Sequence, residues 1–169
     1  MKLKGPIGSA LFGVILAAAC NRGPSDTGYT GTWSRGSSSS GSTISIVKSG
    51  DRYRFFWKLT STDGKWSVTC DKDSYCEETF EGRKSSDHRF VTRVDPASSH
   101  LLVEDAQTLY DRQGGIREQR TDVDELIVEG NGLRLLSYTI ELNGTKLKRG
   151  EGPARSFEKV SNAVMEPGP

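Results

Sequence analysis

Alternation of apolar and polar side chains is the feature that most limits how this chain can fold. Across residues 53–59, the apolar side chains at every second position are Tyr53, Phe55, Trp57 and Leu59. The positions between them hold Arg54, Phe56 and Lys58. A period of two places one set in a core and the other in solvent, so the run predicts a half-buried strand. Phe56 interrupts the polar set, and we expect it to be solvent-exposed.

The same alternation recurs in short runs, at 44–46, 66–70, 79–83, 89–94, 101–104, 126–129, 133–142 and 157–160. Turn signals such as Asn131-Gly132 join them. The charged run 106–126 contains Gly114-Gly115 and predicts a long hairpin or loop with one helical turn, and the serine-rich 34–42 predicts a mobile connection. We therefore predict an all-β fold, an antiparallel meander that closes into a barrel of about eight strands, with a β-sandwich as the alternative.

The N-terminus has the layout of a secretory signal peptide. Lys2 and Lys4 precede an uncharged, largely apolar stretch that ends at Ala19, and Cys20 follows it. The stretch is shorter than the about 20 apolar residues that span a bilayer, so a permanent transmembrane helix is the weaker interpretation. Ala17-Ala18-Ala19 also fits ordinary signal cleavage, which would release a secreted or periplasmic soluble protein.

The sequence Leu16-Ala17-Ala18-Ala19-Cys20 resembles the lipobox of bacterial lipoproteins, although Ala17 stands where leucine is commonest. The resemblance implies that Cys20 is lipidated and anchors the protein to a membrane of the bacterial cell envelope. Asn21 resembles the pattern exported to the outer membrane. The expected organisation is a signal peptide at 1–19, a flexible tether at 20–28, a barrel domain at 29–162 and a disordered tail at 163–169.

Lipidation of Cys20 leaves Cys70 and Cys76 as an even pair. They flank a turn between two β-like runs, so we predict a disulfide that clamps a hairpin. A redox or metal pair is the alternative, but the spacing is not C-x-x-C and both histidines lie outside this loop.

The segment Tyr29-Thr30-Gly31-Thr32-Trp33 resembles the G-x-W signature that opens lipocalins, avidins and other calycins. In that group the tryptophan packs across the closed end of a barrel, often with a basic residue from the last strand. The resemblance implies a structural role for Gly31 and Trp33, with Arg155 or Lys159 as the basic partner. It also implies an interior whose candidate ligand-lining residues are Tyr53, Phe55, Trp57, Trp66 and Val68, although these residues would equally fill a solid core.

Catalytic chemistry has little support in the sequence. Residues 85–89 contain serine, aspartate and histidine, but adjacent positions point in different directions, so we expect no triad and interpret His88 as part of a solvated turn. We predict no catalytic residues, no metal site and no cofactor. With 23 basic and 22 acidic residues the net charge is +1, which argues against a nucleic-acid partner.

These observations predict a lipid-anchored, non-enzymatic envelope protein with a binding or accessory role. Its expected partners are the membrane, through the N-terminal lipid, and either a small apolar ligand or an envelope protein. An exposed apolar patch or rigid loop at 70–76 would instead favour an inhibitor of an envelope hydrolase, or an interaction scaffold.

Overall fold

The structure is a computed structural model and describes residues 28–37, 40–61, 63–148 and 154–164. Its strands are β1 (Gly31–Ser37), β2 (Ser40–Ser49), β3 (Arg52–Thr60), β4 (Trp66–Cys70), β5 (Tyr75–Phe80), β6 (Arg83–Val94), β7 (Leu101–Tyr110), β8 (Ile116–Glu129), β9 (Gly132–Leu142), β10 (Thr145–Lys146) and β11 (Ala154–Ser161). In the part of the chain described, no helix is long and apolar enough to span a membrane. Cys20, the predicted signal peptide and most of the predicted tether and tail lie outside these ranges.

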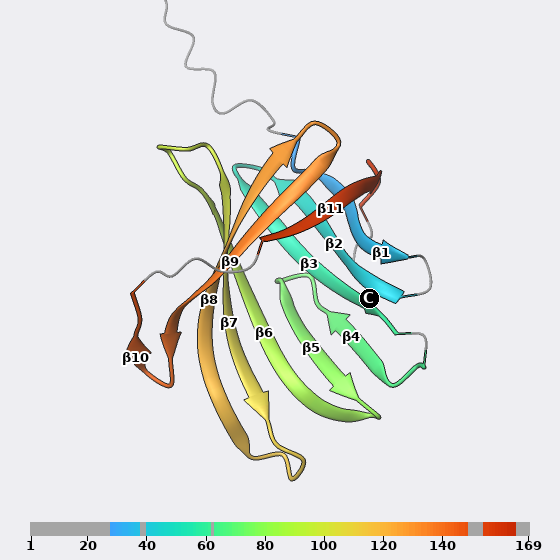
Figure 1. The fold of residues 1–169 in the computed structure, drawn as a ribbon, viewed down its shortest axis with the longest axis vertical. Coiled ribbons are helices and arrows are strands. Elements are labelled where there is room, and N and C mark those ends of the chain that lie inside the picture. The colour runs from blue at the N-terminus through green and yellow to red at the C-terminus, as the bar shows by residue number, and fades with distance from the viewer. Residues whose placement is uncertain (1–27, 38–39, 62, 149–153, 165–169) are drawn as a thin grey trace, which may run out of the picture.

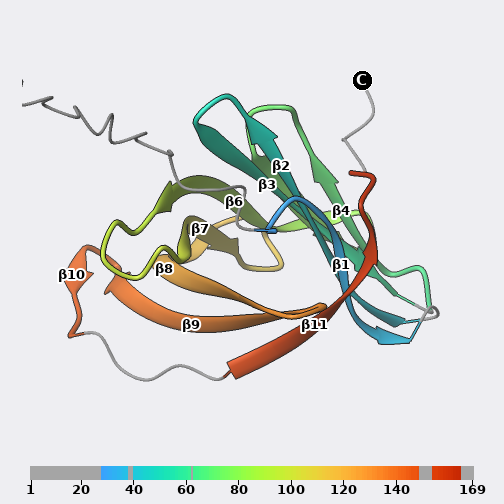
Figure 2. The same cartoon turned by 90° about the horizontal axis from the view of Figure 1, so that it is seen from above.

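One antiparallel sheet contains all of these strands, in the order β3-β2-β1-β11-β9-β8-β7-β6-β5-β4, with β10 paired to β9. The sheet curls until its two end strands, β3 and β4, contact each other, which nearly closes a barrel (Figures 1 and 2). The predicted all-β antiparallel meander is confirmed. The predicted number of about eight strands is wrong, because the sheet has eleven strands.

Two segments that were not predicted as strands belong to the sheet. The serine-rich segment belongs mainly to β1 and β2, which pair from Gly31 to Ser37, so its prediction as a mobile connection is wrong. Strand pairing uses backbone groups, and serines satisfy it without apolar side chains. The charged run 106–126 forms most of the β7–β8 hairpin, which confirms the hairpin and excludes the helical turn.

The inward-facing side chains change from apolar to polar along the barrel. On β7 the buried positions run from Leu101 and Val103 to Asp105 and Gln107. The neighbouring strand runs antiparallel, so Leu126 pairs with Leu101, and Asp122 pairs with Asp105. One end of the interior is therefore apolar and the other is polar.

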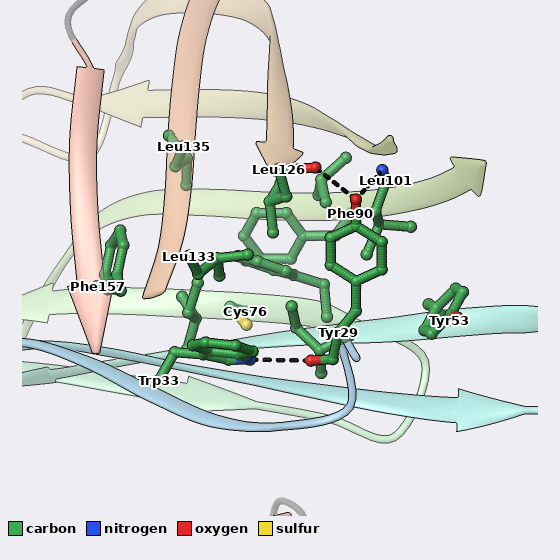
Figure 3. Packing of buried hydrophobic residues seen from close by; sticks show 14 residues of the cluster. Tyr29, Trp33, Tyr53, Cys76, Phe90, Leu101, Leu126, Leu133, Leu135 and Phe157 are labelled. Atoms are coloured by element: carbon green, nitrogen blue, oxygen red, sulfur yellow. Dashed lines mark hydrogen bonds between the residues drawn. The ribbon is translucent and has the colours of Figure 1, made fainter. Parts of the chain in front are cut away.

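The apolar end is closed by Trp33, which is 0% exposed (Figure 3). Its indole Nε1 donates to the Tyr29 carbonyl at 2.9 Å. The Tyr29 hydroxyl donates to the Leu126 carbonyl at 2.8 Å and accepts from the Leu101 N–H at 3.1 Å. These bonds pair the polar atoms of two large aromatic side chains while their rings fill the core.

Lys159 of β11 covers the Trp33 ring, with its Nζ 5.2 Å from the ring centroid. Of the two basic partners considered, Lys159 therefore makes this contact. Gly31 makes room for it, because a Cβ at that position would lie 2.8 Å from Lys159 Cε and 2.7 Å from the Ser161 carbonyl oxygen. The glycine at position 31 thus has a steric reason in this fold.

Side-chain contacts join the strands where the sheet meets itself. The sulfur of Cys70 lies 3.2 Å from the carbonyl oxygen of Trp57 on β3. On β6, which also contacts β3, the Thr92 hydroxyl donates to the carbonyl of Tyr53. Cys70 and Cys76 are cross-strand partners with Cα atoms 4.0 Å apart and form the predicted disulfide. The disulfide therefore clamps the β4–β5 hairpin, and its Cys70 sulfur lies against β3.

Phe56 is 4% exposed, so the prediction that it is solvent-exposed is wrong. Ser45, its partner on β2, is buried as well, and so is Thr32, the partner of Ser45 on β1. These three residues form a row across the sheet. The Thr32 hydroxyl donates to the Ala163 carbonyl at 2.8 Å, which places the chain after β11 over this end of the row. The guanidinium of Arg54 covers the Phe56 ring, with Cζ 5.7 Å from the centroid.

Candidate functional site

The polar half of the barrel contains a partly open cavity of about 300 Å³. Its apolar wall consists of Ile44, Phe55, Trp57, Phe90, Leu109, Leu135 and Phe157. Its polar wall consists of Ser42, Glu78, Ser86, His88, Asp105, Gln107, Arg120, Asp122, Asp124, Ser137 and Arg155. Alternation on each strand produces this arrangement, because residues two apart face the same side of a sheet.

A chain of hydrogen bonds runs along the polar wall from Glu78 to Asp105. The Ser86 hydroxyl donates to Glu78 Oε2 at 2.8 Å and lies 2.9 Å from His88 Nε2. The other ring nitrogen of His88, Nδ1, lies 3.0 Å from Asp105 Oδ2. His88 is 6% exposed on β6, so its interpretation as part of a solvated turn is wrong.

The network continues from Asp105 to the next strand. The Gln107 side-chain amide donates to Asp105 at 2.7 Å and to Asp122 at 2.9 Å. Arg120 donates to the Gln107 amide oxygen and forms an ion pair with Asp122 at 3.2 Å. Thr139 donates to the second oxygen of Asp122 at 2.7 Å. The carboxylate oxygens of Asp122 thus have three side-chain partners, Gln107, Arg120 and Thr139.

Burial changes the titration of two carboxyl groups in this wall. It raises the pKa of Asp124 to about 6, a shift that the nearby Asp105 and Asp122 increase and the Ser137 hydroxyl opposes. Burial also raises the pKa of Asp105, although His88 lowers it through a hydrogen bond and its charge. Desolvation disfavours the ionised form of a carboxyl, which explains both directions.

Aromatic rings form the apolar part of the cavity lining beside these polar groups. Phe55 and Phe90 pack with their ring centroids 4.9 Å apart. Trp57 meets the His88 ring edge-on at 5.1 Å, so the aromatic and polar walls are in direct contact. Trp57 is partly buried, and it lines the cavity.

The five side chains predicted to line a ligand site lie in three different places in the structure. Phe55 and Trp57 line the cavity. Tyr53 packs in the apolar end, edge-on to Tyr29 with their ring centroids 6.0 Å apart, and Val68 packs against the core from β4. Trp66 is 37% exposed and packs against Phe80, with ring centroids 4.6 Å apart.

The connectivity of Ser86, His88 and Asp105 matches that of a serine-hydrolase triad. Asp87, adjacent in sequence, does not belong to it, because the acid comes from β7. The Ser86 hydroxyl, however, donates to Glu78. A hydrolase also needs donors for an oxyanion, and the backbone N–H groups of β6 are occupied by pairing on both sides. We interpret the array as a hydrogen-bond network, and the absence of catalysis stays a prediction.

A second hollow, of about 490 Å³, lies beside the cavity and shares His88, Gln107 and Arg120 with it. Near it, Asp87 accepts hydrogen bonds from Tyr110 and Tyr75 and pairs with Lys84 at 2.7 Å. This hollow is more open, and Tyr75 is the one aromatic side chain among the residues that line it, so the interior cavity is the stronger candidate.

Among the residues that the structure describes, no group of three or more histidine, cysteine, aspartate or glutamate side chains is placed to hold a metal ion. Comparisons with known proteins give no match for this chain, whether with family models, with curated sequences or with solved structures.

Proposed function

We propose that this protein is a lipid-anchored component of the bacterial envelope whose barrel binds a small molecule in its interior without catalysing a reaction. The observation that carries the proposal is the cavity of about 300 Å³ in the polar half of the barrel. Ligand sites in proteins are concave, partly apolar and equipped with a few convergent polar groups, and this cavity has all three properties.

The difference between the two ends of the barrel supports this function. Trp33 and its neighbours fill one end, whereas buried polar side chains surround the cavity at the other. A barrel that needed only stability gains little from buried carboxylates, because desolvating them costs free energy. The polar lining favours a ligand that carries charge or hydrogen-bonding groups over an apolar one.

The proposed location is supported by the sequence before Cys20 and by the disulfide. The lipobox resemblance implies acylation of Cys20, and Asn21 favours the outer membrane. Structural disulfides such as Cys70–Cys76 persist in oxidising compartments, which include the periplasm. The Trp33–Lys159 contact supports, in turn, a calycin-like organisation of the closed end.

Thermal unfolding of the full chain in a non-ionic detergent tests ligand binding. A library of small neutral, cationic and anionic metabolites is screened, and we expect at least one compound to raise the Tm. Ser137→Phe and Ser42→Phe, each of which places a ring in the cavity, should abolish that rise in protein that is still folded by circular dichroism. The absence of any stabilising compound, or a rise that both folded variants retain, would contradict the proposal.

The anchor is tested in the bacterium that makes the protein. Radiolabelled palmitate should enter the wild-type chain but not Cys20→Ser, and that variant should leave the membrane fraction. Cys70→Ser is the matched control, because it removes a cysteine outside the lipobox. Equal labelling of wild type and Cys20→Ser would contradict the proposed lipid anchor at Cys20.

A second candidate function is an interaction scaffold or hydrolase inhibitor, and the exposed pair Trp66 and Phe80 favours it. This pair lies at the opposite end of the β4–β5 hairpin from the disulfide. The turn at 71–75 is instead polar and is held by Asp71, which accepts from the N–H groups of Asp73 and Tyr75. Loss of a co-purifying envelope protein on Trp66→Ser, with ligand binding intact, would favour the scaffold.

A further inference from the structure

We infer that the molecule bound in the cavity is a small organic cation, an amine or quaternary ammonium compound, held between the aromatic wall and the carboxylates. The inference rests on the proposed function, because it names the class of ligand for that same cavity. Three observations support it: which charged side chains of the polar wall are paired, the aromatic side chains in the lining, and the volume of the cavity.

Two of the four cavity carboxylates already have a basic side chain within contact distance. Asp122 pairs with Arg120 at 3.2 Å, and Asp105 lies 3.0 Å from His88. Arg120 is occupied further by the amide oxygen of Gln107 at 3.1 Å. These groups form a network that is complete without a ligand.

Asp124 is not paired in this way. Among the described residues no lysine, arginine or histidine forms an ion pair with it, and its hydrogen-bond partner is the hydroxyl of Ser137. The carboxylates of Asp105 and Asp122 lie close enough to repel it. Asp124 has intermediate exposure. A carboxylate that is largely withdrawn from water without a paired counter-ion is costly, and a cation in the cavity would supply that partner.

Glu78, on the other side of the β6–β7 pair, also lacks a close ion pair. It accepts the hydroxyl of Ser86 at 2.8 Å, and its only ion-pair contact within the described chain is His88 Nε2 at 4.0 Å. The cavity therefore has two carboxylates that are not fully matched, on β5 and on β8. An anionic ligand would meet repulsion from both.

The aromatic wall has the chemistry that organic cations prefer. Trp57, Phe55 and Phe90 line the cavity, and the negative face of an aromatic ring attracts ammonium groups, tryptophan most strongly. Carboxylates and aromatic rings facing one cavity are complementary to an ammonium group with an apolar substituent. A neutral sugar could stack on Trp57, but it would leave Asp124 without a counter-ion.

Arg155 is the other cation of the lining, and it is exposed. Its charge lowers the pKa of Asp124, but less than burial raises it. Arg155 therefore compensates Asp124 only in part. The volume of about 300 Å³ limits the ligand to roughly the size of one ring with a short side chain.

Titration calorimetry with matched probes tests the inference on the full chain in a non-ionic detergent, above neutral pH. Benzylamine and benzyl alcohol have the same shape and differ in charge, as do choline and 3,3-dimethylbutan-1-ol. We expect at least one cation to bind about tenfold or more tightly than its neutral counterpart. Glucose serves as the sugar probe and should not bind.

Asp124→Asn keeps the shape of the side chain and removes its charge. It should weaken binding of the cation by about tenfold, while binding of the neutral probe is unchanged. Asp51→Asn is the matched control, because Asp51 is exposed in the turn between β2 and β3. Trp57→Leu should weaken the cation more than the neutral probe.

The two proposals fail in different ways. Equal binding of charged and neutral probes, tighter binding of glucose, or an unchanged cation affinity in Asp124→Asn would overturn the cationic ligand and leave the cavity as a binding site. Stabilisation by neutral or anionic library compounds alone would do the same. If neither the probes nor any library compound binds the folded protein, both proposals fall.

Discussion

Lys159 and Trp33 are held in contact across the closed end of the barrel, with the ammonium nitrogen 5.2 Å from the ring centroid. The contact joins β11 to β1, the strands that connect the two parts of the meander. The lysine stem passes over Gly31, where a side chain would collide with it. A single glycine thus permits the contact between the first and last long strands.

Gly31→Ala should destabilise the fold by about 1–3 kcal/mol, because φ is +136° there and the new Cβ would meet backbone as well as the lysine stem. Gly50→Ala is the control, since its φ is +65° and no atom lies within 4 Å of the added Cβ. Urea denaturation measures the free energies of unfolding. Equal losses in the two variants would show that the space over Gly31 is not needed.

Reduction of Cys70–Cys76 should lower the free energy of unfolding by about 2 kcal/mol, the chain-entropy contribution of a short loop. The double variant Cys70→Ala/Cys76→Ala should start from the lower stability and not respond to dithiothreitol. Chemical denaturation with and without the reductant makes the comparison. A wild-type protein whose thiols react fully with iodoacetamide before reduction would contradict the disulfide.

Stability should fall as the pH rises from about 4 to about 6, because burial raises the folded-state pKa of Asp124 from the ordinary 3.8 to about 6. In this window the folded state binds more protons than the unfolded state, so each rise in pH favours unfolding. The loss from Asp124 is on the order of 2–3 kcal/mol. Asp105 acts in the same direction, since its pKa is also raised.

Asp124→Asn should remove most of this pH-dependent loss and stabilise the ligand-free protein at neutral pH. Asp51→Asn should keep the wild-type profile. Denaturation curves at several pH values give the slope. A steeper slope in Asp124→Asn than in wild type would show that Asp124 is stabilised as the carboxylate, contrary to this account.

His88→Ala should lower the free energy of unfolding by about 3 kcal/mol, because it removes the imidazole that contacts Asp105 inside the barrel and leaves the carboxylate with the Gln107 amide. His100→Ala removes a comparable contact with Glu125, but the His100 side chain is 29% exposed, so the cost should stay within about 1 kcal/mol. Urea denaturation compares the two variants. Similar losses would indicate that the interior network does not stabilise the fold.

The strands with apolar inward faces were predictable from the sequence, as residues 53–59 show. The β7–β8 pair was harder, because its inward positions change from Leu101 and Val103 to Asp105 and Gln107. Periodicity methods score polarity, and a polar interior has the pattern of a solvated strand. The serine-rich segment 34–42 was predicted as a mobile connection because its pairing in β1 and β2 depends on the backbone and not on apolar side chains.

The candidate site was predictable only in part. Phe55 and Trp57 were found because the alternation of their strand placed them inside. Charged residues at every second position, Arg120, Asp122 and Asp124, were the available signal for the polar wall, and so was the pair Asp105 and Gln107 on the preceding strand. Whether these residues line an interior or face solvent depends on which side of the sheet is inside the barrel, and only the closure of the barrel shows which side that is.

Native mass spectrometry of the full chain, released in a non-ionic detergent from the bacterium that makes it, tests most directly whether the barrel is a binding protein. The account predicts that the folded wild-type protein carries one small molecule, which is lost on unfolding and is absent from folded Ser137→Phe. The account would be contradicted if folded and unfolded wild type had identical masses in every preparation, both without added ligand and after incubation with the library compounds.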